Sequence, residues 1–137
     1  TVVAGSPRWL PSEPPVQVVD ATEVAAARAA AGDLGRAAGL GDARLDELRI
    51  VTSELATNAT RHGAPPATVH LWIRPGEVVV QVSDHGPGID DPWPELRPPA
   101  RTSIGGLGLW IVGQLADRLH IERTATAQTV VTAALRA

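Results

Sequence analysis

The sequence predicts an α+β two-layer sandwich, in which three helices cover one face of a mixed or antiparallel β-sheet. Three segments have helical character, and five shorter segments are rich in the apolar residues typical of strands. Their order along the chain is strand, helix, helix, two strands, a long loop, a helix and two strands. Such an order is typical of a sheet that packs all its helices on one side.

The chain of 137 residues is long enough for one domain with its own hydrophobic core. Residues 1–15 contain four prolines and no hydrophobic periodicity, so we expect a proline-rich linker or tail there. The domain itself is expected to span residues 16–137. The proline-rich start also indicates that the chain was cut from a longer protein.

The first half of the domain predicts a short strand followed by two helices. Residues 16–20 form the strand, and the alanine-rich residues 21–38 form the first helix. The second helix is expected over residues 43–61, with Asp42 as its N-cap. Its core-facing residues recur at helical spacing and are Leu45, Leu48, Thr52, Leu55 and Ala59.

The second half predicts four strands, one loop and one helix. The strands are expected at residues 67–74, 77–84, 119–123 and 128–136. The first two alternate in hydrophobicity and form a hairpin that turns at Pro75-Gly76. A loop with five prolines follows over residues 85–104, and the third helix is expected over residues 106–119.

Composition excludes several kinds of chemistry. There is no cysteine, which excludes disulfides, thiolate metal sites and cysteine nucleophiles, and the spacing of the four histidines predicts no zinc site. All 12 cationic side chains are arginine, so a P-loop lysine is excluded. The net charge of −3 gives no reason to expect direct nucleic-acid or membrane partners. Without a spanning apolar run or a signal peptide, we expect a cytoplasmic location.

Glycines follow the end of the fifth predicted segment, the strand that finishes at Asp84. The next residues are His85-Gly86-Pro87-Gly88. A carboxylate at this position can accept a hydrogen bond from an exocyclic amine, while a flat ring lies over the bare glycine backbone. A tight turn with a turn-favouring aspartate explains the same residues.

Glycines also open the third predicted helix, at positions 105, 106 and 108. The N-terminus of a helix presents unpaired N–H groups and the positive end of its dipole, and glycines let a phosphate approach them. Close packing of the helix on the sheet is an equally ordinary reason for the same glycines.

Glu54 and Asn58 lie one turn apart on a stripe of the second helix beside the core-facing residues, with Arg61 and His62 close behind. An amide oxygen at Asn58 can ligate Mg²⁺ that carries phosphate oxygens. A carboxylate at Glu54 can orient or deprotonate an attacking hydroxyl. A solvated polar face is the alternative interpretation of this stripe.

Taken together, three motifs resemble the N, G1 and G2 boxes of the Bergerat-fold (GHKL) ATPases, the superfamily of DNA gyrase, histidine kinases and mismatch-repair ATPases. The motifs are SELATNATRHG at residues 53–63, DHGPGI at 84–89 and GGLGLWIV at 105–112. The resemblance covers about residues 16–137. Within the superfamily, the first motif is most similar to the anti-sigma-factor serine/threonine kinases.

This resemblance implies ATP and Mg²⁺ as cofactors. Asn58 would hold Mg²⁺, Glu54 would act as the catalytic base and Asp84 would bind the adenine amine. The other expected nucleotide contacts are Arg61, His62, Gly86, Gly88, Ile89, Arg101, Gly105, Gly106, Leu107, Gly108 and Leu109. The loop from 89 to 104 would close over the nucleotide. One departure is Ile104, which stands where a basic residue is expected, with Arg97 and Arg101 as the nearest substitutes.

The function that the resemblance implies is an anti-sigma-factor-type protein serine/threonine kinase that regulates transcription through partner switching. Its partners would be a sigma factor and a STAS-type antagonist that it phosphorylates. The resemblance also implies a homodimer and a longer chain with an N-terminal sensory or regulatory module. Two alternatives stay open: the catalytic domain of a two-component histidine kinase, and a non-catalytic, nucleotide-gated binding module. None of the four histidines stands in a phosphoacceptor context.

Overall fold

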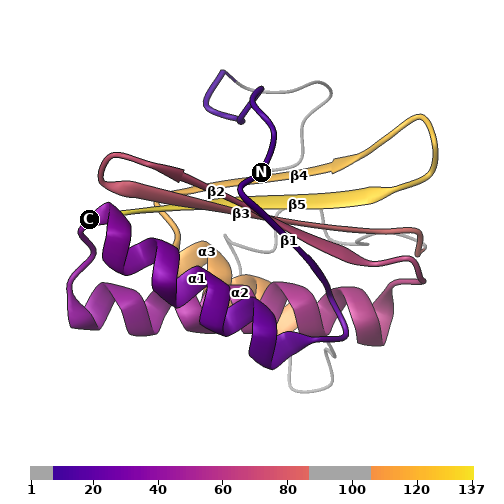
Figure 1. Cartoon of the computed structure of the whole chain (residues 1–137). Coiled ribbons are helices and arrows are strands. Elements are labelled where there is room, and N and C mark those ends of the chain that lie inside the picture. Colours follow the sequence, from indigo (N-terminus) through magenta and orange to yellow (C-terminus); the bar gives the residue numbers. More distant parts are fainter. Residues whose placement is uncertain (1–7, 87–105) are drawn as a thin grey trace.

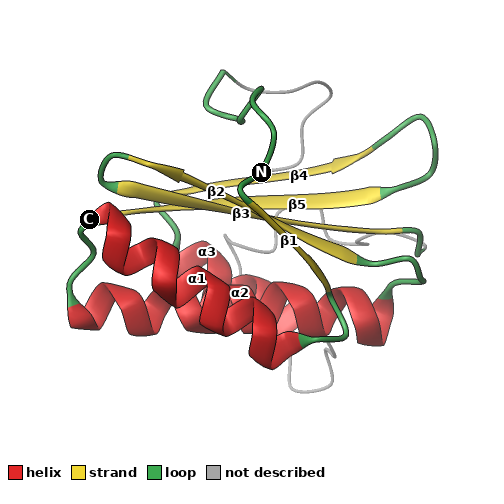
Figure 2. Ribbon diagram, viewed as in Figure 1, coloured by secondary structure: helices red, strands yellow, loops and turns green. Residues whose placement is uncertain are grey.

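A computed structural model describes residues 8–86 and 106–137 of the chain, as a layer of helices under one β-sheet (Figures 1 and 2). In chain order the elements are β1 (Gln17–Asp20), α1 (Val24–Ala38), α2 (Asp42–His62), β2 (Thr68–Arg74), β3 (Glu77–Asp84), α3 (Gly106–Leu115), β4 (Arg118–Arg123) and β5 (Thr129–Arg136). The predicted order of strands and helices is confirmed.

The five described strands form one sheet in the order β1-β2-β3-β5-β4. Every neighbouring pair is antiparallel, so of the two expected kinds of sheet the antiparallel one is present. Figure 2 shows all three helices beneath one face of this sheet. The predicted α+β two-layer sandwich is therefore confirmed.

The main core lies between the sheet and the helices. Alternate residues of β3, namely Val78, Val80 and Val82, are buried there against the apolar side of α2. The same alternation turns Val79 to the opposite face. This period of two fixes the direction of each following side chain, including that of Asp84 at the end of the strand.

The hairpin between β2 and β3 turns at the predicted residues, because Arg74 pairs with Glu77 and leaves Pro75 and Gly76 as the loop. Gly76 has a φ of 72°, a conformation that glycine adopts without the steric cost that a side chain brings.

Two predicted helix starts need correction. α1 begins at Val24 instead of residue 21, because the Asp20 carboxylate accepts hydrogen bonds from the Thr22 amide (2.9 Å) and hydroxyl (2.7 Å) and holds a turn there. Asp42 is the first residue of α2 and not its N-cap; Gly41 takes that position without a side-chain cap.

The predicted end of the third helix is also wrong. α3 ends at Leu115, four residues early, because Arg118 and Leu119 already pair with Ala134 and Ala133 of β5. Across residues 8–86 and 106–137, no helix combines the length and hydrophobicity that crossing a bilayer requires.

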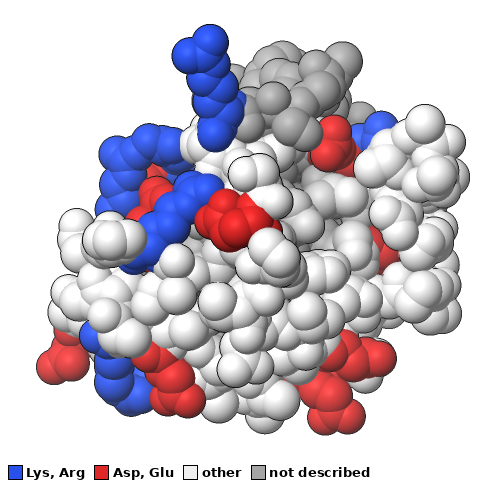
Figure 3. All heavy atoms as spheres, turned by 45° about the horizontal axis from the view of Figure 1, so that its top comes forward, with Lys and Arg blue, Asp and Glu red and all other residues white. Residues whose placement is uncertain are grey.

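Residues 8–15 have no regular secondary structure and pack on the outer face of the sheet, which is the face opposite the helices (Figure 1). Trp9 lies against Trp72, whose indole N–H donates to the Glu13 carbonyl (2.8 Å). Arg74 donates to the Trp9 carbonyl (3.0 Å). Figure 3 shows basic and acidic side chains side by side on this surface, where Glu77 pairs with both Arg74 and Arg136.

Candidate functional site

The polar stripe of α2 faces the first turns of α3. A Cβ atom placed on Gly108 would lie 2.6 Å from Glu54 Oε2 and 3.3 to 3.4 Å from the amide atoms of Asn58. The two predicted motifs therefore meet, although 50 residues separate Asn58 from Gly108. The contact also gives Gly108 a packing reason to lack a side chain.

Asn58 carries an unsatisfied polar group at this meeting point. Its Nδ2 atom is buried and has no hydrogen-bond partner within the described part of the chain. A buried amide donor without a partner costs stability, and such groups are rare in native proteins. A ligand with oxygen acceptors between α2 and α3, such as a phosphate group, would satisfy it.

Asp84 lies beside the C-terminus of α2, where Gly63 caps the helix. Its side chain is buried, with 8% of the residue exposed, and Oδ1 accepts a hydrogen bond from the Gly86 amide (2.7 Å). A Cβ atom on Gly63, the residue that caps α2, would overlap the Asp84 carboxylate. A Cβ on Gly86 would in turn overlap the Gly63 backbone. Two glycines thus let the end of the strand close onto the end of the helix.

α2 holds the two groups of residues on one frame. Five residues separate Asn58 from Gly63, which corresponds to about 7 Å along a helix axis. The arrangement has a polar cluster at Glu54 and Asn58 and a buried carboxylate near Gly63. We call these the phosphate end (Glu54, Asn58, Gly108) and the base end (Gly63, Asp84, Gly86), after the roles predicted for them.

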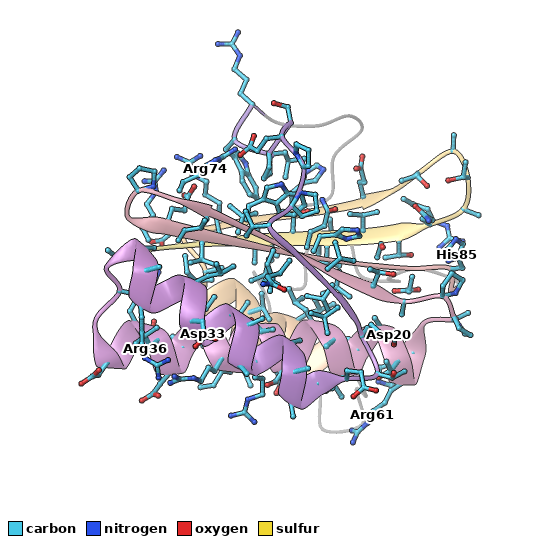
Figure 4. All side chains as sticks on the ribbon, viewed as in Figure 1. Asp20, Asp33, Arg36, Arg61, Arg74 and His85 are labelled. Atoms are coloured by element: carbon cyan, nitrogen blue, oxygen red, sulfur yellow. The ribbon has the colours of Figure 1, made fainter. Side chains whose placement is uncertain are left out.

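The turn that follows Asp84 is held on several sides. The backbone N–H of His85 donates to the Ala64 carbonyl (2.9 Å), and its Nδ1 lies 3.1 Å from the Pro66 carbonyl. Its Nε2 lies 3.1 Å from Gln128 Nε2. Because the glutamine nitrogen is a donor, the neutral ring carries its proton on Nδ1. Figure 4 shows His85 at the edge of the molecule beyond the end of the sheet.

Several predicted site residues lie apart from both ends or outside the described part. Gly88, Ile89, Arg97, Arg101 and Gly105 lie outside the described residues, as does the predicted lid. Gly106 and Leu107 are the first residues of α3, and Leu109 packs its side chain into the main core.

Arg61 and His62 are exposed at the end of α2, and within the described residues their side chains form no hydrogen bond or ion pair. In Figure 4 Arg61 extends away from the sheet. The structure does not bring it to Asp84.

Arg123 is the residue that the sequence analysis missed. From the end of β4, its Nη1 donates to the Gly86 carbonyl (2.6 Å) and to Thr129 Oγ1 (2.9 Å). In the sequence, Arg123 is recognisable only as a charged residue at the end of the predicted strand segment HIER. Gly63 was part of a quoted motif, but nothing in the sequence indicated that Asp84 is its neighbour.

Comparisons with known proteins agree with this geometry. A family model described as the histidine kinase-like ATPase domain matches residues 18–135. The solution NMR structure of the histidine kinase domain of the E. coli osmosensor EnvZ has 22% sequence identity and a TM-score of 0.50, with 91% of each chain covered, and this likeness concerns the fold. No significant match to a curated protein was found. Since the family match takes in all three helices and both ends of the site, this chain belongs to the histidine kinase-like ATPase domain family.

Proposed function

We propose that this chain is an ATP-dependent protein serine/threonine kinase of the anti-sigma-factor type, with Mg·ATP bound between α2, α3 and the end of β3. One observation carries the proposal. Glu54 and Asn58 lie in the C-terminal half of α2 and face the first turns of α3, and the buried Asp84 carboxylate lies against Gly63, the residue that caps the same helix. This spacing matches a ligand with a polar ring at one end and a chain of anionic groups at the other.

At the base end, the Asp84 carboxylate accepts a hydrogen bond from the exocyclic amine of adenine. Gly86 has no side chain, so a flat ring can approach the backbone beside that carboxylate. The Gly86 amide already occupies one lone pair of Oδ1 and thereby keeps the carboxylate from rotating away. Guanine presents a carbonyl oxygen in place of the amine, and a carboxylate repels it.

At the phosphate end, both atoms of the Asn58 amide have a use. Oδ1 is a suitable ligand for Mg²⁺, and the unpaired Nδ2 donates to a phosphate oxygen. The first amides of α3 point toward the same phosphates. When bound, Mg²⁺ neutralises part of the charge on the transferred group.

Glu54 lies where it can accept the proton of a substrate serine or threonine hydroxyl. The hydroxyl oxygen forms a bond to the γ-phosphorus, while the bond from that phosphorus to the β–γ bridging oxygen breaks and ADP leaves. The proton passes to a Glu54 carboxylate oxygen. Its half-buried position beside α3 limits competition from water.

The protein substrate that we propose is a STAS-type antagonist, with a sigma factor as the alternative partner. The support is the motif SELATNATRHG, which resembles the anti-sigma-factor kinases. Bound nucleotide then decides which of the two proteins is held, and the antagonist is released once it is phosphorylated.

A histidine kinase catalytic domain is the second candidate, and the structural likeness to the EnvZ kinase domain favours it. The two candidates differ in the bond that they form. Phosphoserine and phosphothreonine survive acid, whereas phosphohistidine is hydrolysed by it. Acid treatment of a labelled substrate therefore separates them.

The test incubates the chain with Mg²⁺, γ-labelled ATP and the STAS-type protein encoded nearest to its gene. We expect acid-stable label on a serine or threonine of the antagonist. Glu54→Gln should lower the labelling rate by about 100-fold or more while Mg·ATP still binds. Glu23→Gln, an exposed glutamate without a side-chain hydrogen bond, is the matched control and should leave the rate unchanged.

Three results would contradict the proposal in different ways. Acid-labile label would favour the histidine kinase. Full activity in Glu54→Gln would show that Glu54 is not the catalytic base. Failure of the wild type to bind Mg·ATP by calorimetry would remove the nucleotide site as a whole.

A further inference from the structure

We infer that Arg123 is a positioning residue for the base end of the site: its guanidinium fixes the Gly86 carbonyl and so sets both affinity for the nucleoside and preference for adenine. The inference rests on the proposed function, since it concerns how that nucleotide is recognised. It assigns a role to a residue that belongs to none of the three motifs.

The register of the sheet brings Arg123 to the site. Asp84 of β3 pairs with Thr129 of β5, and Thr129 pairs with Arg123 of β4. The three residues form one row across the end of the sheet. Residues of the same parity on these strands, such as Val82, Val131 and Ile121, are buried on the helix side. The row therefore faces the same side as the candidate site.

Hydrogen bonds fix Gly86 from both sides. Its N–H donates to Asp84 Oδ1 (2.7 Å), and its carbonyl accepts from Arg123 Nη1 (2.6 Å). Thr129 Oγ1 accepts from the same Nη1 (2.9 Å) and orients the guanidinium. Glycine loses more backbone freedom on ordering than any other residue. Because Arg123 already holds the Gly86 carbonyl, the entropy cost of ordering Gly86 arises on folding and not on nucleotide binding.

The anchor also acts on Asp84. The Gly86 N–H and carbonyl belong to the two peptide groups on either side of its Cα, so the Arg123 contact acts on the N–H by restricting the φ and ψ angles of Gly86. Without that contact the N–H holds Asp84 Oδ1 less firmly, and the carboxylate can turn. A carboxylate that turns accepts a hydrogen bond from adenine less well and repels the guanine carbonyl less strictly. Loss of the Arg123 contact should therefore lower the affinity for ATP and the preference for ATP over GTP together.

The experiment compares wild type, Arg123→Ala and Arg123→Lys with the control Arg118→Ala. Arg118 lies on the same strand but on the outer face, where its guanidinium is over the Trp9 ring, so the control removes the same charge away from the site. Calorimetry measures the dissociation constants of Mg·ATP, Mg·GTP and magnesium tripolyphosphate. Tripolyphosphate has no base and reports only on the phosphate end.

Arg123→Ala should weaken Mg·ATP binding by about tenfold, the effect of losing one charge-assisted hydrogen bond. The ratio of ATP to GTP affinity should fall, and binding of tripolyphosphate should stay within about twofold of wild type. The Mg·ATP affinity of Arg123→Lys should lie between those of the wild type and Arg123→Ala, because a lysine ammonium keeps the charge but lacks the planar fork of donors. Arg118→Ala should match the wild type.

Two results would overturn the inference. Unchanged Mg·ATP affinity in Arg123→Ala would show that the anchor does not matter. An equal loss for tripolyphosphate would show that the substitution damages the whole site and not the base end. If the wild type bound no nucleotide, the proposed function would fall and the role in adenine preference would fall with it.

A second measurement works on the ligand-free protein and does not depend on nucleotide binding. Amide hydrogen exchange at Gly86 should become faster in Arg123→Ala, while exchange at Val79 in the centre of the sheet should not change. Unaltered exchange at Gly86 would contradict the anchoring itself.

Discussion

The base end and the phosphate end both lie along the C-terminal half of α2 but differ in how fully their polar groups are satisfied. At the base end, Asp84 holds the Gly86 amide and Arg123 holds the Gly86 carbonyl. At the phosphate end, Asn58 Nδ2 is buried and has no partner among residues 8–86 and 106–137. Folding thus satisfies the polar groups of the base end, whereas at the phosphate end a ligand could supply the missing partner.

This difference indicates how affinity and stability are divided along α2. Order in place before binding lowers the cost of binding, so the base end is suited to recognition. A buried unpaired donor costs about 1–3 kcal/mol of folding free energy. If a phosphate binds there as proposed, the phosphate end recovers this folding free energy on binding. The first three predictions below each alter one end and leave the other as the reference.

The largest effect is expected for Gly63→Ala at the base end. The new Cβ would overlap the Asp84 carboxylate and the Ala59 carbonyl. Neither can withdraw, because Asp84 is buried against Gly86 and the Ala59 carbonyl accepts the Gly63 N–H (3.1 Å). Urea unfolding should show a loss of about 1–3 kcal/mol. Mg·ATP affinity should fall with it, and wild-type stability would show that this end is less tightly packed.

The next effect has the opposite sign and concerns Asn58→Leu at the phosphate end. Leucine has nearly the shape of asparagine and removes the unpaired Nδ2, so the ligand-free protein should gain about 1 kcal/mol. Mg²⁺-dependent ATP binding should be lost in calorimetry. Asn58→Asp is the companion variant, because it keeps an oxygen ligand for Mg²⁺. Destabilisation by Asn58→Leu would mean that Asn58 has a structural role.

Gly108→Ala should change stability by less than about 1 kcal/mol, although its Cβ would lie 2.6 Å from Glu54 Oε2. The crowded atom is the tip of a flexible side chain, which can move, and alanine favours the helix over glycine. Phosphoryl transfer should fall more than Mg·ATP affinity, since Glu54 is displaced. A loss of stability equal to that of Gly63→Ala would erase the contrast between the two ends.

The smallest effect concerns pH and a residue of the outer face, away from both ends. Burial lowers the pKa of His120, and the Glu122 carboxylate 4.0 Å away partly opposes the shift. The folded protein disfavours the charged imidazole ring. The contribution of neutral His120 to the free energy of unfolding is therefore fully present above about pH 6.5 and is lost as the pH falls below that value.

Thermal unfolding of wild type and His120→Gln between about pH 7.5 and pH 5.5 checks this. The melting temperature of the wild type should fall more steeply on acidification, and Mg·ATP affinity at neutral pH should be the same for both. Equal slopes would show that His120 does not carry the dependence.

The sequence predicted what depends on local spacing and missed what depends on register. Glu54 and Asn58 were found together because four residues make one helical turn, and the hairpin was found at Pro75-Gly76. Arg123 reaches Gly86 only through the pairing of β3 with β5 and of β5 with β4, which no local pattern encodes. The early end of α3 has the same origin, because strand pairing at Arg118 overrides the helical pattern.

The alternation along β3 has a consequence for how this fold can vary. Val80 and Val82 face the helices, and Asp84 lies two residues after Val82. Because side chains alternate along a strand, this even spacing turns the carboxylate to the helix side as well. Insertion of a single residue between Val82 and Asp84 would leave every motif spelled as before, yet it would turn the acid to the side where Trp9 and Trp72 pack. In this strand, only an insertion or deletion of an even number of residues therefore keeps the carboxylate on the helix side.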